Sequence, residues 1–84
     1  MNIAFTELGE REYTWWEKHD PRKFRRLVAL CHAVLVDPFR GIGKPEPLKH
    51  ELQGCWSRRI DGMHRLVYLI DGDRVLILSC RFHY

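Results

Sequence analysis

The sequence has no long hydrophobic run. Its first apolar segment, Ile3 to Phe5, is three residues long, and Glu7 follows shortly after it. A signal peptide contains a run of about 7–15 apolar residues and a membrane-spanning helix about 20. We therefore expect neither kind of segment, and we expect the protein to act in the cytoplasm without contact with a membrane.

Cysteine is scarce, and its spacing matches no known disulfide or metal-binding pattern. Cys31, Cys55 and Cys80 are an odd number, lie far apart and form no C-x-x-C pair, which argues against a disulfide framework and against a structural zinc site. The five histidines show no ligand spacing with cysteines or carboxylates. We expect no metal or other cofactor, and we expect reduced cysteines that are partly buried as small apolar residues.

What the chain does contain is the ordinary composition of a small folded protein. It has 84 residues, of which 45% are hydrophobic and 30% charged, so we expect one globular domain spanning residues 1–84. The net charge of +3 is unevenly distributed: residues 1–20 contain two Lys/Arg and five Asp/Glu, and residues 21–84 contain twelve and six. An anionic partner would bind the second part, although charge alone does not identify it.

Two helices are expected in the first half. Thr6 can cap the stretch ELGEREYTWWEKH, which is acidic in its first turn and places Leu8, Trp15 and Trp16 close to one face. Asp20 and Pro21 form a second start signal, an N-cap followed by proline. From there to about Val36 the apolar residues follow three-and-four spacing: Phe24, Leu27, Val28, Cys31, Val34 and Leu35.

Strands are expected at the start of the chain and throughout its second half. Residues 2–5 can form an edge strand, and residues 39–49 are rich in Gly and Pro and read as a connecting loop. Three β-favouring runs follow, CWSRRI, HRLVYLI and RVLILSCRF, separated by Asp-Gly pairs. The predicted fold is therefore α+β: two N-terminal helices packed on one face of a small, twisted, mainly antiparallel sheet.

One stretch of the loop, GKPEPLKH, carries a candidate catalytic group. Glu46 lies between two prolines, and Lys44 and Lys49 flank it. Cleavage of RNA without a metal requires a base for the ribose 2′-OH, a cation for the transition-state charge and an acid for the leaving oxygen. Glu46, Arg65 and His83 would supply one of each.

Further residues could bind the substrate. Lys49 and Arg59 could hold flanking phosphates, and Tyr84 could stack on a base. Each also has an ordinary alternative. Glu46 can be a solvated carboxylate, the residues at positions 83 and 84 can be a frayed end, and the arginines at positions 58, 59 and 65 can form a solvated sheet face. His64 is more often a turn-flanking residue than a catalyst. These residues alone leave the function open.

Four blocks in this half of the chain resemble a known family. F-x-G-x-G-K-P-E-P-L-K-H begins at Phe39, and W-S-R-R-I, H-R-L-V-Y and a final C-R-F-H-Y follow in order. They look like the YoeB/Txe toxins of the RelE superfamily, the toxin halves of bacterial type II toxin–antitoxin pairs. The resemblance is dense from Phe39 to Tyr84, and the tryptophan-rich first helix shares it in pattern.

The resemblance implies a RelE-like, microbial-RNase-like fold and a specific activity. Toxins of this kind are endoribonucleases that enter the ribosomal A site and cleave mRNA there without a metal. Carried over residue by residue, Glu46 is the base, His83 the acid and Arg65 the transition-state cation. Substrate contacts would come from Lys44, Lys49, Arg59 and Tyr84.

The resemblance also implies partners: a cognate antitoxin of the YefM/Axe type, mRNA, the bacterial ribosome and a second copy in a homodimer. A non-catalytic RNA-binding or protein-binding module of the same fold is the alternative, and a gyrase-poisoning relative would not be expected to retain the three catalytic residues.

Overall fold

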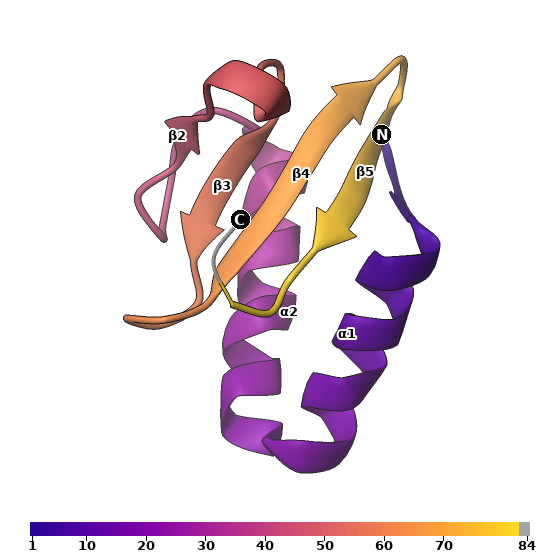
Figure 1. Ribbon diagram of the computed structural model, residues 1–84, viewed down its shortest axis with the longest axis vertical. Coiled ribbons are helices and arrows are strands. Elements are labelled where there is room, and N and C mark those ends of the chain that lie inside the picture. Colours follow the sequence, from indigo (N-terminus) through magenta and orange to yellow (C-terminus); the bar gives the residue numbers. More distant parts are fainter. Residues whose placement is uncertain (83–84) are drawn as a thin grey trace.

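The computed structural model describes residues 1–82 (Figure 1). The helices are α1 (Glu7–His19), α2 (Pro21–Val36) and the short 3-10 helix η1 (His50–Leu52). The strands are β1 (Asn2–Phe5), β2 (Glu46–Pro47), β3 (Trp56–Arg59), β4 (Arg65–Asp71) and β5 (Arg74–Ser79). Both long helices and the early strand occur where the sequence predicts them.

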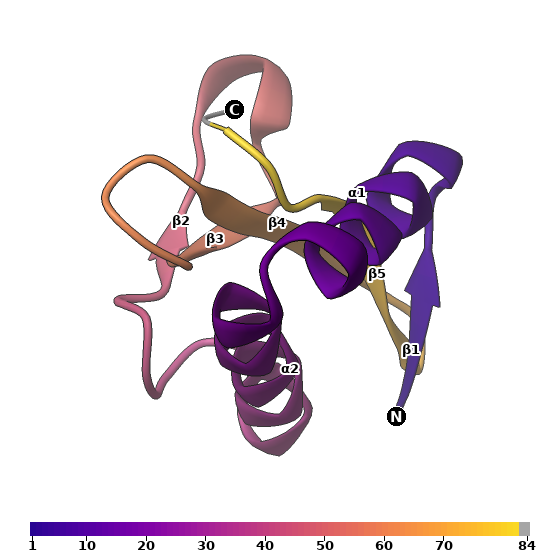
Figure 2. The same cartoon turned by 90° about the horizontal axis from the view of Figure 1, so that it is seen from below.

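The five strands form one sheet in the order β1-β5-β4-β3-β2. The pairs β2–β3, β3–β4 and β4–β5 are antiparallel, and β1 runs parallel to β5. The helix α2 packs on one side of the sheet, and η1 and the chain after β5 lie on the other (Figure 2), while α1 packs against both β5 and α2. The α+β prediction is confirmed, and the predicted three-stranded meander is widened by an edge strand on each side.

The predicted caps start both helices. The Thr6 hydroxyl accepts a hydrogen bond from the backbone N–H of Gly9 at 3.0 Å, and the Asp20 carboxylate accepts one from the N–H of Lys23 at 3.1 Å. A β-carbon at Gly9 would collide with the carbonyl oxygen of Ile77. Glycine at this position therefore lets α1 approach β5 closely, which explains a residue that otherwise disfavours a helix.

Two apolar clusters stabilise the fold, one on each face of the sheet. The main core lies between the helices and the sheet, and its buried members include Trp16, Leu27, Leu30, Leu66 and Tyr68. The second, smaller cluster lies on the opposite face and contains Leu48, Cys55 and Val67, with Leu52, Leu69 and Leu78 packed against them. All three cysteines are buried, as predicted, and burial raises the pKa of the Cys31 thiol to about 11.

Two details of the prediction are wrong. Leu8 is 43% exposed, because it points away from the main core and lines an open groove with Leu78 and Phe82. The connection between β3 and β4 spans residues 60–64, not a two-residue turn. Asp61 organises it, because its Oδ1 accepts hydrogen bonds from the N–H groups of Met63 and His64, at 2.8 and 2.6 Å.

Candidate active site

Glu46 lies on an edge strand rather than in the loop that the sequence predicts. It pairs with Ser57, and Pro47 pairs with Trp56, across the antiparallel β2–β3 ladder. Proline has no N–H to donate and is tolerated where a strand has a neighbour on one side only. The Glu46 side chain is exposed, so the short strand presents its carboxylate to solvent from a backbone held by the sheet.

Strand alternation places three predicted residues on one face. Leu66 belongs to the main core, whereas Val67 belongs to the cluster on the opposite face. Arg65 precedes Leu66 and therefore shares the face of Val67. Arg59 pairs with Arg65. Paired residues of a ladder lie on the same face, so Arg59 joins Arg65 on it.

The strand pairing places Glu46 on the same face. It pairs with Ser57, and Ser57 pairs with Val67. We call the face that carries Glu46, Arg59, Arg65 and Val67 the open face. Glu46 and Arg65 lie two strands apart in the sheet and are offset by two residues along the strand direction. The distance between their Cα atoms is therefore about 12 Å. A phosphodiester bound over this gap could contact both a base and a cation.

The two predicted lysines lie on either side of Glu46. Lys49 and Glu46 line a shallow concavity of about 380 Å³ together with Pro47, Leu48, His50 and Leu52. Lys44 is exposed two residues before Glu46, in a left-handed backbone conformation with φ of 51°. Lys49 therefore shares the concavity with Glu46, whereas Lys44 does not line it.

The Arg65 side chain is held over the connection that precedes it. Its NH1 donates to the carbonyl oxygens of Asp61, at 2.8 Å, and His64, at 3.1 Å. The Asp61 carboxylate is fixed in turn by an ion pair with Lys23. Burial alone would raise the pKa of the Asp61 carboxyl, but the hydrogen bonds from Lys23 and from the N–H groups of His64 and Met63 lower it to about 2.

The segment after β5 is hydrogen-bonded to α1 and β4. The Trp16 indole N–H donates to the carbonyl oxygen of Cys80 at 2.7 Å, and the Glu12 carboxylate accepts from the N–H groups of Cys80 and Arg81. The Arg65 N–H donates to the carbonyl oxygen of Phe82 at 3.2 Å. The chain therefore passes beside Arg65 at Phe82. The predicted acid His83 and the predicted substrate residue Tyr84 lie outside the described residues.

Comparison with known proteins assigns the family. The sequence model described as "YoeB-like toxin of bacterial type II toxin-antitoxin system" matches residues 5–84. The chain belongs to the YoeB toxin family. It is therefore a toxin of the type found in bacterial toxin–antitoxin systems. The toxin YoeB of Synechocystis sp. is 55% identical over 84 residues, which is all of this chain and 98% of the relative.

Solved structures of YoeB relatives have the same fold. The YoeB/ParE toxin from Agrobacterium tumefaciens matches with a TM-score of 0.96 and 40% identity, and the match covers both chains completely. YoeB from Staphylococcus aureus has been solved as a dimer and in a heterotetrameric YoeB–YefM complex. Both structures match with a TM-score of 0.91 and 36% identity, over 100% of this chain and 98% of the relative.

The sequence does not predict the structural role of one arginine of this YoeB-family chain. Arg58 is 0% exposed, so the solvated alternative is wrong for it. Its guanidinium donates to the Tyr68 hydroxyl at 3.1 Å and to three backbone carbonyl oxygens, those of Asp37, Arg40 and Ile42, at 2.6 to 3.1 Å. Alternation along a strand places Arg58 and Arg59 on opposite faces, so at least one of them must face away from the core, but no sequence pattern marks the carbonyl partners of Arg58.

Arg58 fixes the path of the chain toward Glu46. The three carbonyl groups belong to the segment between α2 and β2. Gly43 continues this segment with φ of 85°, and a β-carbon there would press on Leu30 and Arg58. The Gly43 carbonyl accepts from the N–H of Arg59 at 2.7 Å. The backbone that leads into β2 is therefore anchored to β3 both by the Arg58 side chain and by a backbone hydrogen bond.

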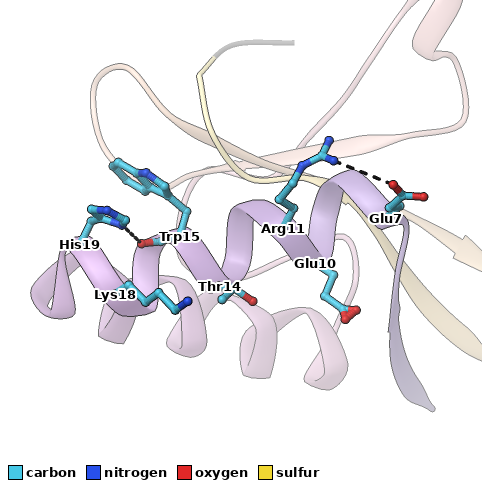
Figure 3. Close-up of a pocket in the computed structure, with 7 residues that line it drawn as sticks. All are labelled: Glu7, Glu10, Arg11, Thr14, Trp15, Lys18 and His19. Atoms are coloured by element: carbon cyan, nitrogen blue, oxygen red, sulfur yellow. Dashed lines mark hydrogen bonds and ion pairs between the residues drawn. The ribbon is translucent and has the colours of Figure 1, made fainter.

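The YoeB-family chain has another concavity, which lies along α1 (Figure 3). It measures about 520 Å³, and seven residues of α1 line it: Glu7, Glu10, Arg11, Thr14, Trp15, Lys18 and His19. Its charges are mixed, and one ion pair, Arg11–Glu7, spans 3.9 Å. Among residues 1–82, none of the predicted catalytic or substrate residues lines it, so we place the site on the open face.

Within residues 1–82, no group of three or more His, Cys, Asp and Glu side chains is arranged to hold a metal ion. No helix in the same range combines the length and the apolar character needed to cross a membrane.

Proposed function

We propose that this YoeB-family toxin is a ribosome-dependent endoribonuclease that cleaves mRNA in the A site without a metal. The observation that supports the proposal best is the common orientation of Glu46, Arg59 and Arg65, which three neighbouring strands present on the open face. A carboxylate and two guanidinium groups there can act on a phosphodiester. The family resemblance adds the acid, His83, and the ribosome as the place of cleavage.

The proposed reaction is an in-line transfer of the phosphoryl group. Glu46 removes the proton of the ribose 2′-OH, and the 2′-oxygen attacks phosphorus. The bond from phosphorus to the 5′-oxygen breaks, and His83 donates a proton to that oxygen. Arg65 stabilises the charge that develops on the non-bridging oxygens. The products of this step are a 2′,3′-cyclic phosphate end and a free 5′-hydroxyl, and a water molecule that then adds to the cyclic phosphate would open it to a 3′-phosphate.

The remaining predicted residues would position the RNA. Arg59 offers a planar fork that can bind a phosphate with two hydrogen bonds, while Lys44 and Lys49 act as point charges beside Glu46. Tyr84 would stack on or orient the substrate base. Because the proposal relies on fixed geometry, the anchored approach to β2 is part of it.

We also propose the partners that the relatives suggest. A YefM/Axe-type antitoxin would neutralise the toxin with an acidic segment that orders on binding, and the YoeB–YefM complex of the Staphylococcus aureus protein supports this pairing. The dimer of that protein supports a homodimer. The site of action would be the cytoplasm, where the ribosomes are.

Primer extension on an mRNA tests the activity, with the purified toxin added in the presence and absence of programmed ribosomes. We expect cleavage at an A-site codon with ribosomes only. Glu46→Gln and His83→Ala should each slow cleavage by about 10²- to 10⁴-fold. Glu51→Gln is the matched control for Glu46→Gln, because Glu51 is an exposed carboxylate on η1, five residues further along.

The same experiment tests the alternative of a binding module. If the folded wild-type toxin binds programmed ribosomes but leaves the mRNA intact, the protein binds without cleaving. If Glu46→Gln cleaves as fast as Glu51→Gln, Glu46 is not the base.

A further inference from the structure

His64 contacts the segment that precedes the predicted acid. Its Nδ1 accepts a hydrogen bond from the backbone N–H of Phe82 at 2.6 Å. The two rings also lie close together, with centroids 5.1 Å apart and an interplanar angle of 51°. The next residue of β4, Arg65, donates its own N–H to the Phe82 carbonyl oxygen. Two successive residues therefore bind the two polar groups of a single residue.

The Phe82 backbone is one that needs such support. Its φ is 59°, in the left-handed region that a bulky side chain rarely occupies, because the β-carbon then approaches the following carbonyl. A residue in this conformation persists only where its surroundings hold it. Residue 83 is bonded directly to Phe82, so the contacts that hold Phe82 fix the backbone immediately before it.

The His64 ring is itself placed firmly. Its backbone N–H donates to Asp61 Oδ1 at 2.6 Å. The edge of the ring meets the Trp16 indole, with centroids 4.9 Å apart and an interplanar angle of 88°. Trp16 is buried and donates to the carbonyl of Cys80. The position of Nδ1, which accepts from the Phe82 N–H, is therefore fixed by the turn at Asp61 and by the contact of the ring with the Trp16 indole.

From these contacts we infer that His64 is a positioning residue for the cleavage reaction. Its Nδ1 fixes the Phe82 peptide, the last described peptide before the acid at residue 83. The inference rests on the proposed function, in which His83 is that acid. The role requires an acceptor at the position of Nδ1 and no proton transfer by His64 itself, which makes it distinct from catalysis.

Two amides of similar size separate this role from a general packing role. In His64→Asn the side-chain oxygen can occupy the place of Nδ1, whereas the longer side chain of His64→Gln carries its oxygen closer to the place of Nε2. We expect His64→Gln to lower the single-turnover rate constant of mRNA cleavage at saturating toxin by about 10- to 100-fold, as small misplacements of reacting groups do. The toxin concentration at half-saturation should change little.

His64→Asn should recover the rate to within about threefold of the wild type, because it restores the acceptor. Met63→Gln is the control for the turn, since Met63 is 56% exposed and adjacent to His64, and it should cleave at the wild-type rate. Circular dichroism and thermal unfolding of the three variants show whether each is folded under the assay conditions.

The outcomes separate this inference from the proposed function. If the wild type does not cleave mRNA on ribosomes, the proposed function fails first. If the wild type cleaves and folded His64→Gln cleaves equally fast, His64 does not position the acid. If His64→Asn and His64→Gln lose the same amount of rate, or if only the half-saturating concentration changes, the acceptor role of Nδ1 is wrong.

Discussion

Asp61 is the single side chain that organises the connection between β3 and β4. One carboxylate oxygen accepts from the N–H groups of Met63 and His64, and the other forms the ion pair with Lys23. The Asp61 side chain is 20% exposed and that of Lys23 is 39% exposed. The ion pair is therefore only partly screened by water, and it joins α2 to the turn that precedes Arg65.

These contacts make the stability of the protein depend on pH. The pKa of Asp61 is about 2 in the folded protein and near 3.8 ordinarily. Because the folded value is lower, the ionised carboxylate stabilises the fold above pH about 4, and this contribution is lost as the pH falls toward 2. We expect Asp61→Asn to lower the free energy of unfolding at pH 7 by about 1–2 kcal/mol. This is less than the full pKa shift would give, because the carboxylate is partly exposed and water screens its interactions.

Urea unfolding of the wild type and Asp61→Asn between pH 7 and pH 2 measures this contribution. The difference in unfolding free energy between the two proteins should shrink as the pH falls. Asp71→Asn is the control, because Asp71 forms an exposed pair with Arg74 and should contribute less than about 1 kcal/mol. A difference for Asp61→Asn that stays constant across this range would contradict the assignment.

At the scale of elements, the position of β2 depends on the buried guanidinium of Arg58. We expect Arg58→Met to lower the free energy of unfolding by about 2–4 kcal/mol, because the carbonyl groups that it now binds would be left buried without a donor. Arg58→Lys should recover only part of the loss, since an ammonium group lacks the fork that reaches several carbonyls. Urea denaturation measures both variants.

The neighbouring arginine is the control for this prediction. Arg59 is exposed, so Arg59→Met should change the stability by less than about 0.5 kcal/mol. Amide hydrogen exchange supplies a second measurement, because the segment before β2 should exchange faster in folded Arg58→Met than in Arg59→Met. Equal stabilities of Arg58→Met and Arg59→Met would show that Arg58 does not anchor this segment.

The elements differ in how far the sequence predicts them. The helices carry local signals, the caps at Thr6 and Asp20, and alternation in β4 places Leu66 and Val67 on opposite faces as observed. Strand β2 carries no such signal, since two residues between prolines pair only because β3 offers its edge. The partners of Arg58 are likewise set by tertiary packing, because they lie 10 to 21 residues away.

At the scale of the whole molecule, two cations near the start of α2 bind the end of β3 and the connection that follows it. Lys23 pairs with Asp61, and Arg26 donates to the carbonyl oxygen of Arg59. The start of α2 therefore lies beside the connection that joins Arg59 to Arg65. Arg74 belongs to β5 and lies near the β4–β5 turn, at the other end of the sheet (Figure 1).

If the toxin binds ribosomes as proposed, this arrangement predicts that the start of α2 contributes to that binding. Neutralising the exposed Arg25 at the start of α2 should weaken binding to programmed ribosomes and reduce the slope of log affinity against log salt by about 1, because one phosphate contact is lost. Arg74→Gln removes the same charge far from the open face and should leave the slope as it is. The cleavage rate at saturation should not change in either variant.

Binding titrations of Arg25→Gln and Arg74→Gln at several salt concentrations compare the two positions directly. Charges further apart than about 8 Å are largely screened at physiological ionic strength, so a position-dependent effect requires local contact. If both variants shift the affinity equally, the net charge of +3 governs association and the start of α2 is not part of the RNA-binding surface. If Arg25→Gln alone has the effect, that surface extends from the open face onto α2.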